Sequence, residues 1–220
     1  ADWVKARALS WGMNFFYFNK ILQLPLMITS VISGVSITDC IEHLIFSSNQ
    51  YKALNKLSEL FIEEARSIQK GGFEYKFSED WLGIYWPLDE YCYIELATNN
   101  MMEEFYDECQ SSLLALCPPN VDSLLLAEAI KLNKELISTP HKHGEVNIEL
   151  AYDLSAFWGA FKSGASQSKP SMQKTLFQVK HPIKYDSIND WCQRVVWWGN
   201  KKGAYLGQIT GNQPEIAGHF

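Results

Sequence analysis

The sequence YKALNKLSELFIEEARSIQK, residues 51–70, is the clearest amphipathic helix in the chain. Its apolar side chains recur three and four positions apart, which places them along one face of an α-helix. These side chains are Leu54, Leu57, Leu60, Phe61 and Ala65. Gly71 and Gly72 follow and are expected to end the helix. Because a helix with one apolar face must pack against other elements, this segment predicts a mainly helical domain.

Further helices are predicted on both sides of this segment. Residues 2–24 carry apolar side chains around nearly the whole helix, as expected of a helix buried on several sides. Pro25 predicts a kink or a new helix start, and Ser36 is expected to cap a short helix to about Phe46. Later helices are expected after Pro87 and Asn100, although residues 91–96 could equally form a strand. Others are capped by Asp122, by Asp153 and by Asp186 or Ser187.

Alternating apolar and polar residues predict a smaller β component. Phe73, Tyr75 and Phe77 alternate with polar residues, as in a half-buried strand or an extended linker. Residues 146–150, 175–179 and 203–209 also suit strands, whereas 164–174 is expected to form a loop and the tail after Thr210 to be weakly ordered.

These elements predict a mainly α protein with a small β component, that is, an α+β fold. The N-terminal part is expected to be helical and the C-terminal part mixed. We expect residues 1–72 to form a helical subdomain and residues 73–220 an α+β subdomain, unless the chain forms one compact domain overall.

Composition limits the possible functions. Of 220 residues, 47% are hydrophobic, which is enough apolar surface for a folded core. The net charge of -6 argues against a nucleic-acid partner. Five scattered cysteines without a CxxC pair, and no signal-peptide pattern, indicate reduced thiols and a cytoplasmic location. The uncharged run 21–37, interrupted by Pro25 and Gly34, predicts a buried helix pair rather than a membrane span.

One short segment carries metal-ligand side chains. His141, His143 and Glu145 are spaced by two residues before a predicted strand, where alternation would direct all three to one face and allow a shared metal ion. The alternative is a solvated turn, since Pro140 and Gly144 flank these positions.

Two aromatic groups are candidates for a substrate or partner surface. Trp3, Arg7 and Trp11 belong to the first predicted helix, where core packing is the alternative for the aromatic side chains. At the end of the last predicted helix, tryptophans and cations can form a stacking and anion-binding edge, or can instead fill the core and complement the helix dipole. These residues are Arg194, Trp197, Trp198, Asn200, Lys201 and Lys202.

Two segments carry a family resemblance. The first is DWVKAR, residues 2–7, followed by Trp11, Tyr17, Phe18, Lys20 and LQLPL at 22–26; the second is WCQRVVWWG, residues 191–199. Together they resemble the helical region that follows the catalytic barrel in some cobalamin-binding radical SAM proteins.

The resemblance implies a parent enzyme that uses an iron-sulfur cluster, S-adenosylmethionine and cobalamin for radical chemistry on an unactivated carbon. This sequence has no C-x-x-x-C-x-x-C motif, so no cofactor is expected in this chain itself. The resemblance implies instead an accessory domain that packs on the barrel and shapes substrate access. The alternatives are a stand-alone helical protein-interaction or ligand-binding module, and a small metal site at His141, His143 and Glu145.

Overall fold

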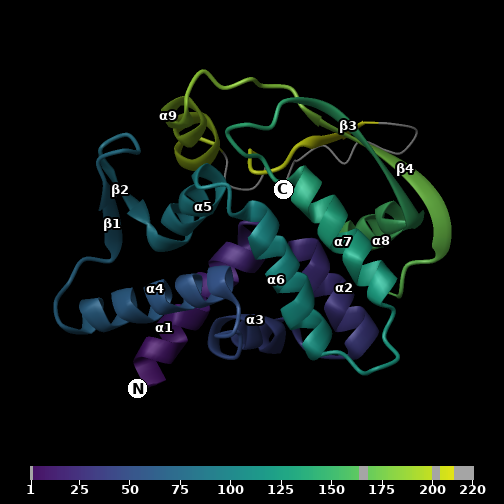
Figure 1. The fold of residues 1–220 in the computed structure, drawn as a ribbon, viewed down its shortest axis with the longest axis horizontal. Coiled ribbons are helices and arrows are strands. Elements are labelled where there is room, and N and C mark those ends of the chain that lie inside the picture. The colour runs from purple at the N-terminus through teal and green to yellow at the C-terminus, as the bar shows by residue number, and fades with distance from the viewer. Residues whose placement is uncertain (1, 164–167, 200–203, 211–220) are drawn as a thin grey trace.

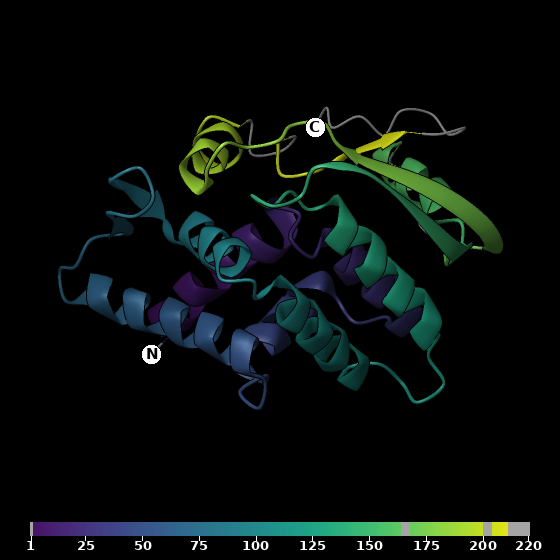
Figure 2. The ribbon, with the colours of Figure 1, turned by 45° about the horizontal axis from the view of Figure 1, so that its top comes forward.

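The computed structural model describes residues 2–163, 168–199 and 204–210. Most of the helices form one body, on one side of which the sheet β3–β4–β5 forms a separate layer over α2 and α7 (Figures 1 and 2). The helices of this body are α1 (Asp2–Gly12), η1 (Met13–Phe18), α2 (Gln23–Ser33), α3 (Ile37–Phe46), α4 (Lys52–Gln69), α5 (Leu88–Thr98), α6 (Met102–Ala115) and α7 (Ser123–Leu136).

The remaining elements form two antiparallel sheets and their connections. They are β1 (Tyr75–Ser78), β2 (Ile84–Pro87), β3 (Gly144–Tyr152), α8 (Leu154–Lys162), β4 (Met172–His181), α9 (Ile188–Trp191), η2 (Cys192–Trp197) and β5 (Gln208–Thr210). The mainly helical α+β class predicted from the sequence is therefore confirmed. Gly203 and the tail after Thr210 lie outside the described residues, as do positions 164–167 of the predicted loop.

Four helices begin where a side chain accepts a hydrogen bond from a first-turn amide. Ser36 Oγ accepts from the Asp39 amide at 3.1 Å, and Ser187 Oγ accepts from the Asp190 amide at 3.1 Å. Asp122 Oδ1 lies 3.1 Å from the Leu125 amide, and Asp153 Oδ1 lies 3.0 Å from the Ala156 amide. These bonds satisfy amides that lack an intrahelical acceptor, and they confirm the predicted starts of α3, α7, α8 and α9.

The long first helix predicted over residues 2–24 is shorter than expected. Helix α1 continues as a π-helical turn, η1, which ends at Phe18, and the chain then bends by 98° into α2. Lys20 in this turn has a positive φ of 63°, and Pro25 lies in the first turn of α2, where a missing amide is tolerated. In the part of the chain that the structure describes, no single helix has the length and apolar content to cross a bilayer.

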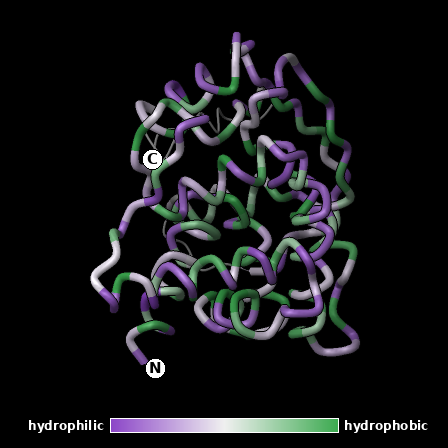
Figure 3. The backbone as a smooth tube through the Cα atoms, turned by 60° about the vertical axis from the view of Figure 1, so that its left-hand side comes forward, coloured by the Kyte–Doolittle hydropathy of each residue, from purple (hydrophilic) through white to green (hydrophobic). Residues whose placement is uncertain are grey.

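The main core lies between the helices. Leu54, Leu57, Phe61 and Ala65 are buried there, as the spacing along α4 predicts. Apolar and polar positions alternate along the helices in the hydropathy-coloured tube (Figure 3). Trp86 and Trp191 belong to the same cluster, so residues on both sides of position 72 share one core.

A second apolar cluster joins the sheet layer to the helices. Ile148, Leu150 and Tyr152 of β3 face α2 and α7, as their alternation predicts, whereas Val146 is exposed. Strand β4 begins at Met172, three residues earlier than predicted, because it pairs along most of β3.

The β1–β2 hairpin carries aromatic side chains on its solvent-exposed face. Phe73, Tyr75 and Phe77 are 80%, 52% and 51% exposed, and Tyr85 beside Phe77 is 56% exposed. The inner face is taken by Trp86, which pairs with Lys76 in the sheet. Of the two alternatives predicted here, a half-buried strand and an extended linker, residues 75–78 form the strand, and Trp86 of β2 is buried on its inner face.

Candidate functional site

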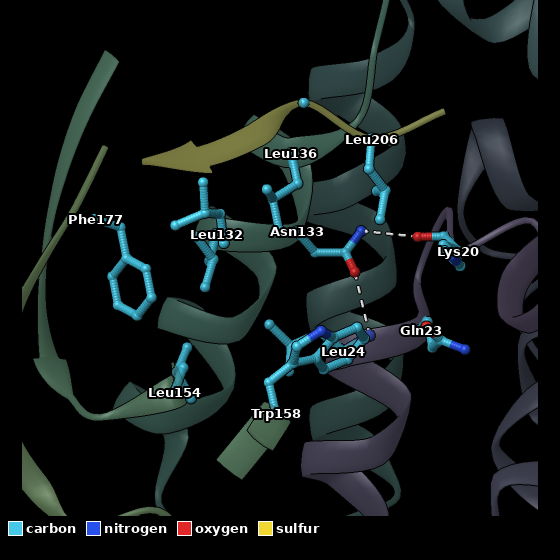
Figure 4. A pocket seen from close by; sticks show the side chains of 12 residues that line it. Lys20, Gln23, Leu24, Leu132, Asn133, Leu136, Leu154, Trp158, Phe177 and Leu206 are labelled. Atoms are coloured by element: carbon cyan, nitrogen blue, oxygen red, sulfur yellow. Dashed lines mark hydrogen bonds between the residues drawn. The ribbon is translucent and has the colours of Figure 1, made fainter. Parts of the chain in front are cut away.

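Buried polar side chains gather around the turn between η1 and α2. Asn133 of α7 donates through Nδ2 to the carbonyl oxygens of Lys20 at 3.2 Å and Ile21 at 2.8 Å. Its Oδ1 accepts from the Leu24 amide at 3.1 Å (Figure 4). The Tyr106 hydroxyl of α6 donates to the Ile21 carbonyl at 2.6 Å. Helices α6 and α7 thus fix a turn whose backbone groups would otherwise be buried without partners.

A pocket opens beside this turn, between α2 and α7 on one side and α8, β4 and β5 on the other (Figure 4). The empty space within it is about 570 Å³, a volume that includes solvent at its open mouth. Its walls are mainly apolar, with three polar side chains at one end. The lining residues are Lys20, Gln23, Leu24, Leu132, Asn133, Leu136, Leu154, Trp158, Phe177, Leu206, Gly207 and Ile209.

Gln23 is the polar group that distinguishes this pocket. Its side chain is buried, at 8% exposure, and its Oε1 has no hydrogen-bond partner among the described residues. An unsatisfied buried acceptor destabilises a fold by about 1–3 kcal/mol. Sequence reasoning missed this residue as a site, although Gln23 is one of the few polar residues in the uncharged run 21–37.

Two buried carboxylates lie at the first turn of α5. Asp89 and Glu90 are both buried, and Asp89 Oδ2 accepts from Asn19 Nδ2 at 2.7 Å. The positive end of the helix dipole favours acidic side chains at this position. Burial raises the pKa of the nearby Tyr205 hydroxyl well above its ordinary value, and the charge of Glu90 adds to this effect. The Tyr205 hydroxyl therefore stays protonated at neutral pH.

The predicted metal ligands follow one another along the chain from the α7–β3 connection, which contains His141 and His143, into β3. His141 lines a cleft with Glu103, Lys134 and Lys142, whereas Glu145 lies in β3 and pairs with Lys180 at 2.6 Å. Across residues 2–163, 168–199 and 204–210, no three His, Cys, Asp or Glu side chains form a group that could hold a metal ion. The metal site remains a prediction.

Replacing His141 and His143 together with alanine tests that prediction. Because the structure does not assemble these side chains with Glu145, we expect the zinc bound after dialysis to be the same as in the unaltered chain. Elemental analysis measures this, with His43→Ala as a control on α3. If the double variant loses one equivalent of zinc and the control variant does not, the result would support the predicted metal site.

The five cysteines are free thiols, four of them buried and Cys117 partly buried. Burial raises the pKa of each of these thiols. For Cys40 and Cys192 the pKa rises to about 12. The other three, Cys92, Cys109 and Cys117, shift in the same direction.

The predicted partner residues of the first helix divide between core and surface. Trp11 is buried in the main core, and Arg7 lies over its ring at 4.3 Å while pairing with Glu74 just before β1. Trp3 is 45% exposed. The surface predicted on this helix is therefore reduced to Trp3 and the partly exposed Arg7.

The C-terminal aromatic group is largely at the surface. Trp197 and Trp198 are 44% and 69% exposed, and their rings stack with centroids 5.5 Å apart. Arg194 Nε pairs with Asp190 Oδ1 at 2.7 Å, so this cation is already engaged. Asn200, Lys201 and Lys202 lie outside the described residues.

The hairpin links these two aromatic groups along one side of the molecule (Figure 1). Glu74, next to β1, pairs with Arg7 of α1. At the other end, the Leu82 amide donates to Asn189 Oδ1 of α9 at 3.2 Å, and Trp197 packs edge-on against Trp86. We call the exposed outer residues Phe73, Tyr75, Phe77 and Tyr85 the aromatic surface.

His181 introduces a pH dependence of stability at the edge of the sheet. Its Nε2 lies 2.9 Å from the Glu135 carbonyl oxygen, and burial lowers its pKa despite the favourable effect of Glu135, with Lys142 lowering it further. The unfolded chain therefore binds a proton more readily than the folded chain, and stability falls as pH falls through about 6.5.

We expect His181→Gln to flatten this part of the profile. Urea unfolding measured between pH 8 and pH 5 should show a smaller loss of stability on acidification for the variant than for the unaltered chain. If the stability of the variant and of the unaltered chain changes equally with pH, His181 has the same pKa in the folded and the unfolded state.

The fold and these features define a mainly helical α+β protein with a sheet layer, an interlayer pocket and an exposed aromatic hairpin. The sequence matches no protein-family model and no curated protein significantly.

Proposed function

We propose that this chain is an accessory domain of a radical SAM, cobalamin-dependent enzyme, where it packs on the catalytic barrel and shapes substrate access. The observation that carries the proposal is the aromatic surface. Aromatic residues are enriched in protein interfaces and supply much of their binding energy. Four such side chains, each more than half exposed, are costly to leave in water unless a partner covers them.

The hairpin that carries this surface is held in place from several sides. Lys76 Nζ pairs with Glu64 Oε1 of α4 at 2.6 Å and lies 5.4 Å from the Tyr91 ring centre. Trp86 is buried beneath it and donates to the Trp81 carbonyl oxygen at 3.1 Å. A surface held in its binding geometry loses little conformational entropy on association, which favours a docking role.

The resemblance supports the choice of partner. Two stretches that carry it, residues 2–7 and 191–199, belong to the elements that flank the hairpin, α1 on one side and α9 with η2 on the other. The rest of the first segment, to Leu26, continues through η1 into α2. Residues 2–7 and 191–199 therefore lie on elements beside the aromatic surface.

The native gene provides the first test. The proposal requires that the native protein contain a C-x-x-x-C-x-x-C segment in addition to this chain, and a native protein without one overturns it. The stand-alone interaction or ligand-binding module predicts a native protein without that segment.

In the native protein, we expect the triple variant Phe73→Ser, Phe77→Ser, Tyr85→Ser to expose the hairpin to solvent. These side chains are on the surface of the chain, so its own stability should change by less than about 0.5 kcal/mol per site. Hydrogen exchange of residues 73–87 should rise at least tenfold relative to the unaltered protein.

Leu124→Ser is the matched control, because Leu124 is an exposed apolar residue on α7 away from the hairpin. It should leave the exchange of residues 73–87 unchanged. If the hairpin exchanges equally fast in the native protein and in the triple variant, no domain covers the aromatic surface and the proposal fails.

A further inference from the structure

The interlayer pocket combines an apolar body with one unused acceptor. Gln23 Oε1 is buried without a hydrogen-bond partner among the described residues, at the end of the pocket where Lys20 and Asn133 also lie. The Asn133 amide is fully engaged by the Lys20 and Ile21 carbonyl oxygens and by the Leu24 amide. Gln23 Oε1 thus remains an unsatisfied acceptor at this end of the pocket.

We propose that this pocket binds a small, neutral, mainly aliphatic molecule whose hydroxyl or amide group donates a hydrogen bond to Gln23 Oε1. A carbonyl oxygen can only accept, so the ligand must supply the donor. An ammonium donor is disfavoured because the cationic side chain of Lys20 lines the same pocket. A neutral hydroxyl or amide satisfies both conditions.

The remaining walls determine the rest of the ligand. Leu24, Leu132, Leu154, Phe177 and Ile209 are all buried apolar residues that converge on the pocket from α2, α7, α8, β4 and β5. Ligand sites commonly have this composition, a mainly apolar lining with few polar groups that fix orientation. The part of the pocket between these walls is narrow, which suits a short chain of a few heavy atoms.

A pair of isomeric probes tests the donor requirement. 1-Butanol and methyl propyl ether contain the same atoms, but only the alcohol has a hydroxyl donor. In titrations of the ¹⁵N-labelled chain followed by NMR, we expect saturable shifts of the Gln23 side-chain amide and the Leu24 backbone amide. The alcohol should bind about tenfold more tightly than the ether, as expected for one hydrogen bond to a buried acceptor.

Two variants separate the hydrogen bond from the pocket. Gln23→Leu keeps the side-chain volume and removes the acceptor, so it should bind the two isomers equally. Leu136→Trp, at the partly exposed rim, should weaken both probes by narrowing the pocket. Gln69→Leu, the same change at an exposed position on α4, should retain the tenfold preference.

Three outcomes overturn the proposal. They are equal affinities for the alcohol and the ether in the unaltered chain, a preference that persists in Gln23→Leu, and the absence of saturable shifts at Gln23 and Leu24. None of these depends on the aromatic surface, so the pocket and the accessory function stand or fall separately.

Discussion

Replacing Asn133 with alanine should lower the free energy of unfolding by about 3–4 kcal/mol. The substitution removes one amide that holds the Lys20 and Ile21 carbonyl oxygens and the Leu24 amide. All of these groups belong to the bend between η1 and α2. The Lys20 carbonyl oxygen and the Leu24 amide would lose the hydrogen bond to Asn133, whereas the Ile21 carbonyl oxygen would keep the one from the Tyr106 hydroxyl. Because the bend positions α2 beneath the sheet, the loss should affect both apolar clusters.

Urea denaturation followed by far-UV circular dichroism measures this effect. Asn55→Ala is the matched control, since the Asn55 side-chain amide donates to the exposed Glu59 on the same helix. The control should change stability by less than about 0.5 kcal/mol. If Asn133→Ala costs no more than Asn55→Ala, the three hydrogen bonds do not determine the position of α2.

Replacing Trp191 with alanine should cost about 3–5 kcal/mol, the range observed for large core aromatic side chains. Trp191 is completely buried and packs edge-on against Tyr93, with ring centroids 5.3 Å apart. Its indole nitrogen donates to Ser138 Oγ at 3.3 Å, and the Ser138 amide donates to the Tyr205 carbonyl oxygen at 2.7 Å. Trp191 thus attaches the C-terminal segment to α5 and to the end of α7.

Trp198→Ala removes the same side chain from an exposed position and should cost less than about 1 kcal/mol. Trp191→Phe, which keeps most of the apolar contact and loses the hydrogen bond to Ser138, provides a folded variant if the alanine variant does not fold. In urea denaturation, the loss of stability in Trp191→Phe should be smaller than in Trp191→Ala and larger than in Trp198→Ala. Equal losses for Trp191→Ala and Trp198→Ala would contradict the assignment of Trp191 to the core.

Local signals predicted most of the helices. Ser36, Asp122, Asp153 and Ser187 each accept a hydrogen bond from an amide two or three residues later, and such bonds depend on sequence neighbours alone. The amphipathic face of α4 was predicted for the same reason, since a helix brings residues three and four apart onto one side.

The hairpin and the pocket depend on distant parts of the chain, which local patterns cannot identify. Alternation at 73–77 predicted a half-buried strand or an extended linker, but it does not tell which side chains are buried; in the structure Trp86 is buried and the three aromatic residues are exposed. In the sequence, Asn133 and Gln23 look like ordinary polar helix residues. Their difference arises only where α7 approaches the η1–α2 turn: Asn133 forms hydrogen bonds to the turn, whereas Gln23 Oε1 has no hydrogen-bond partner among the described residues. The first helix ends early because η1 adopts a wider turn, which its aromatic sequence does not distinguish from an α-helix.

The two-stranded hairpin also has consequences for the behaviour of the chain at high concentration. In the described part of the chain no third strand pairs with β1 or β2, so each strand presents an outer row of backbone N–H and C=O groups. Natural proteins protect such edges with charged side chains, but β1 and β2 contain one charge between them, Lys76, which is paired with Glu64. Backbone pairing between the hairpins of two molecules would extend the sheet from one molecule into the next and stack their aromatic rings. We therefore expect aggregation to begin at hairpins that no partner covers.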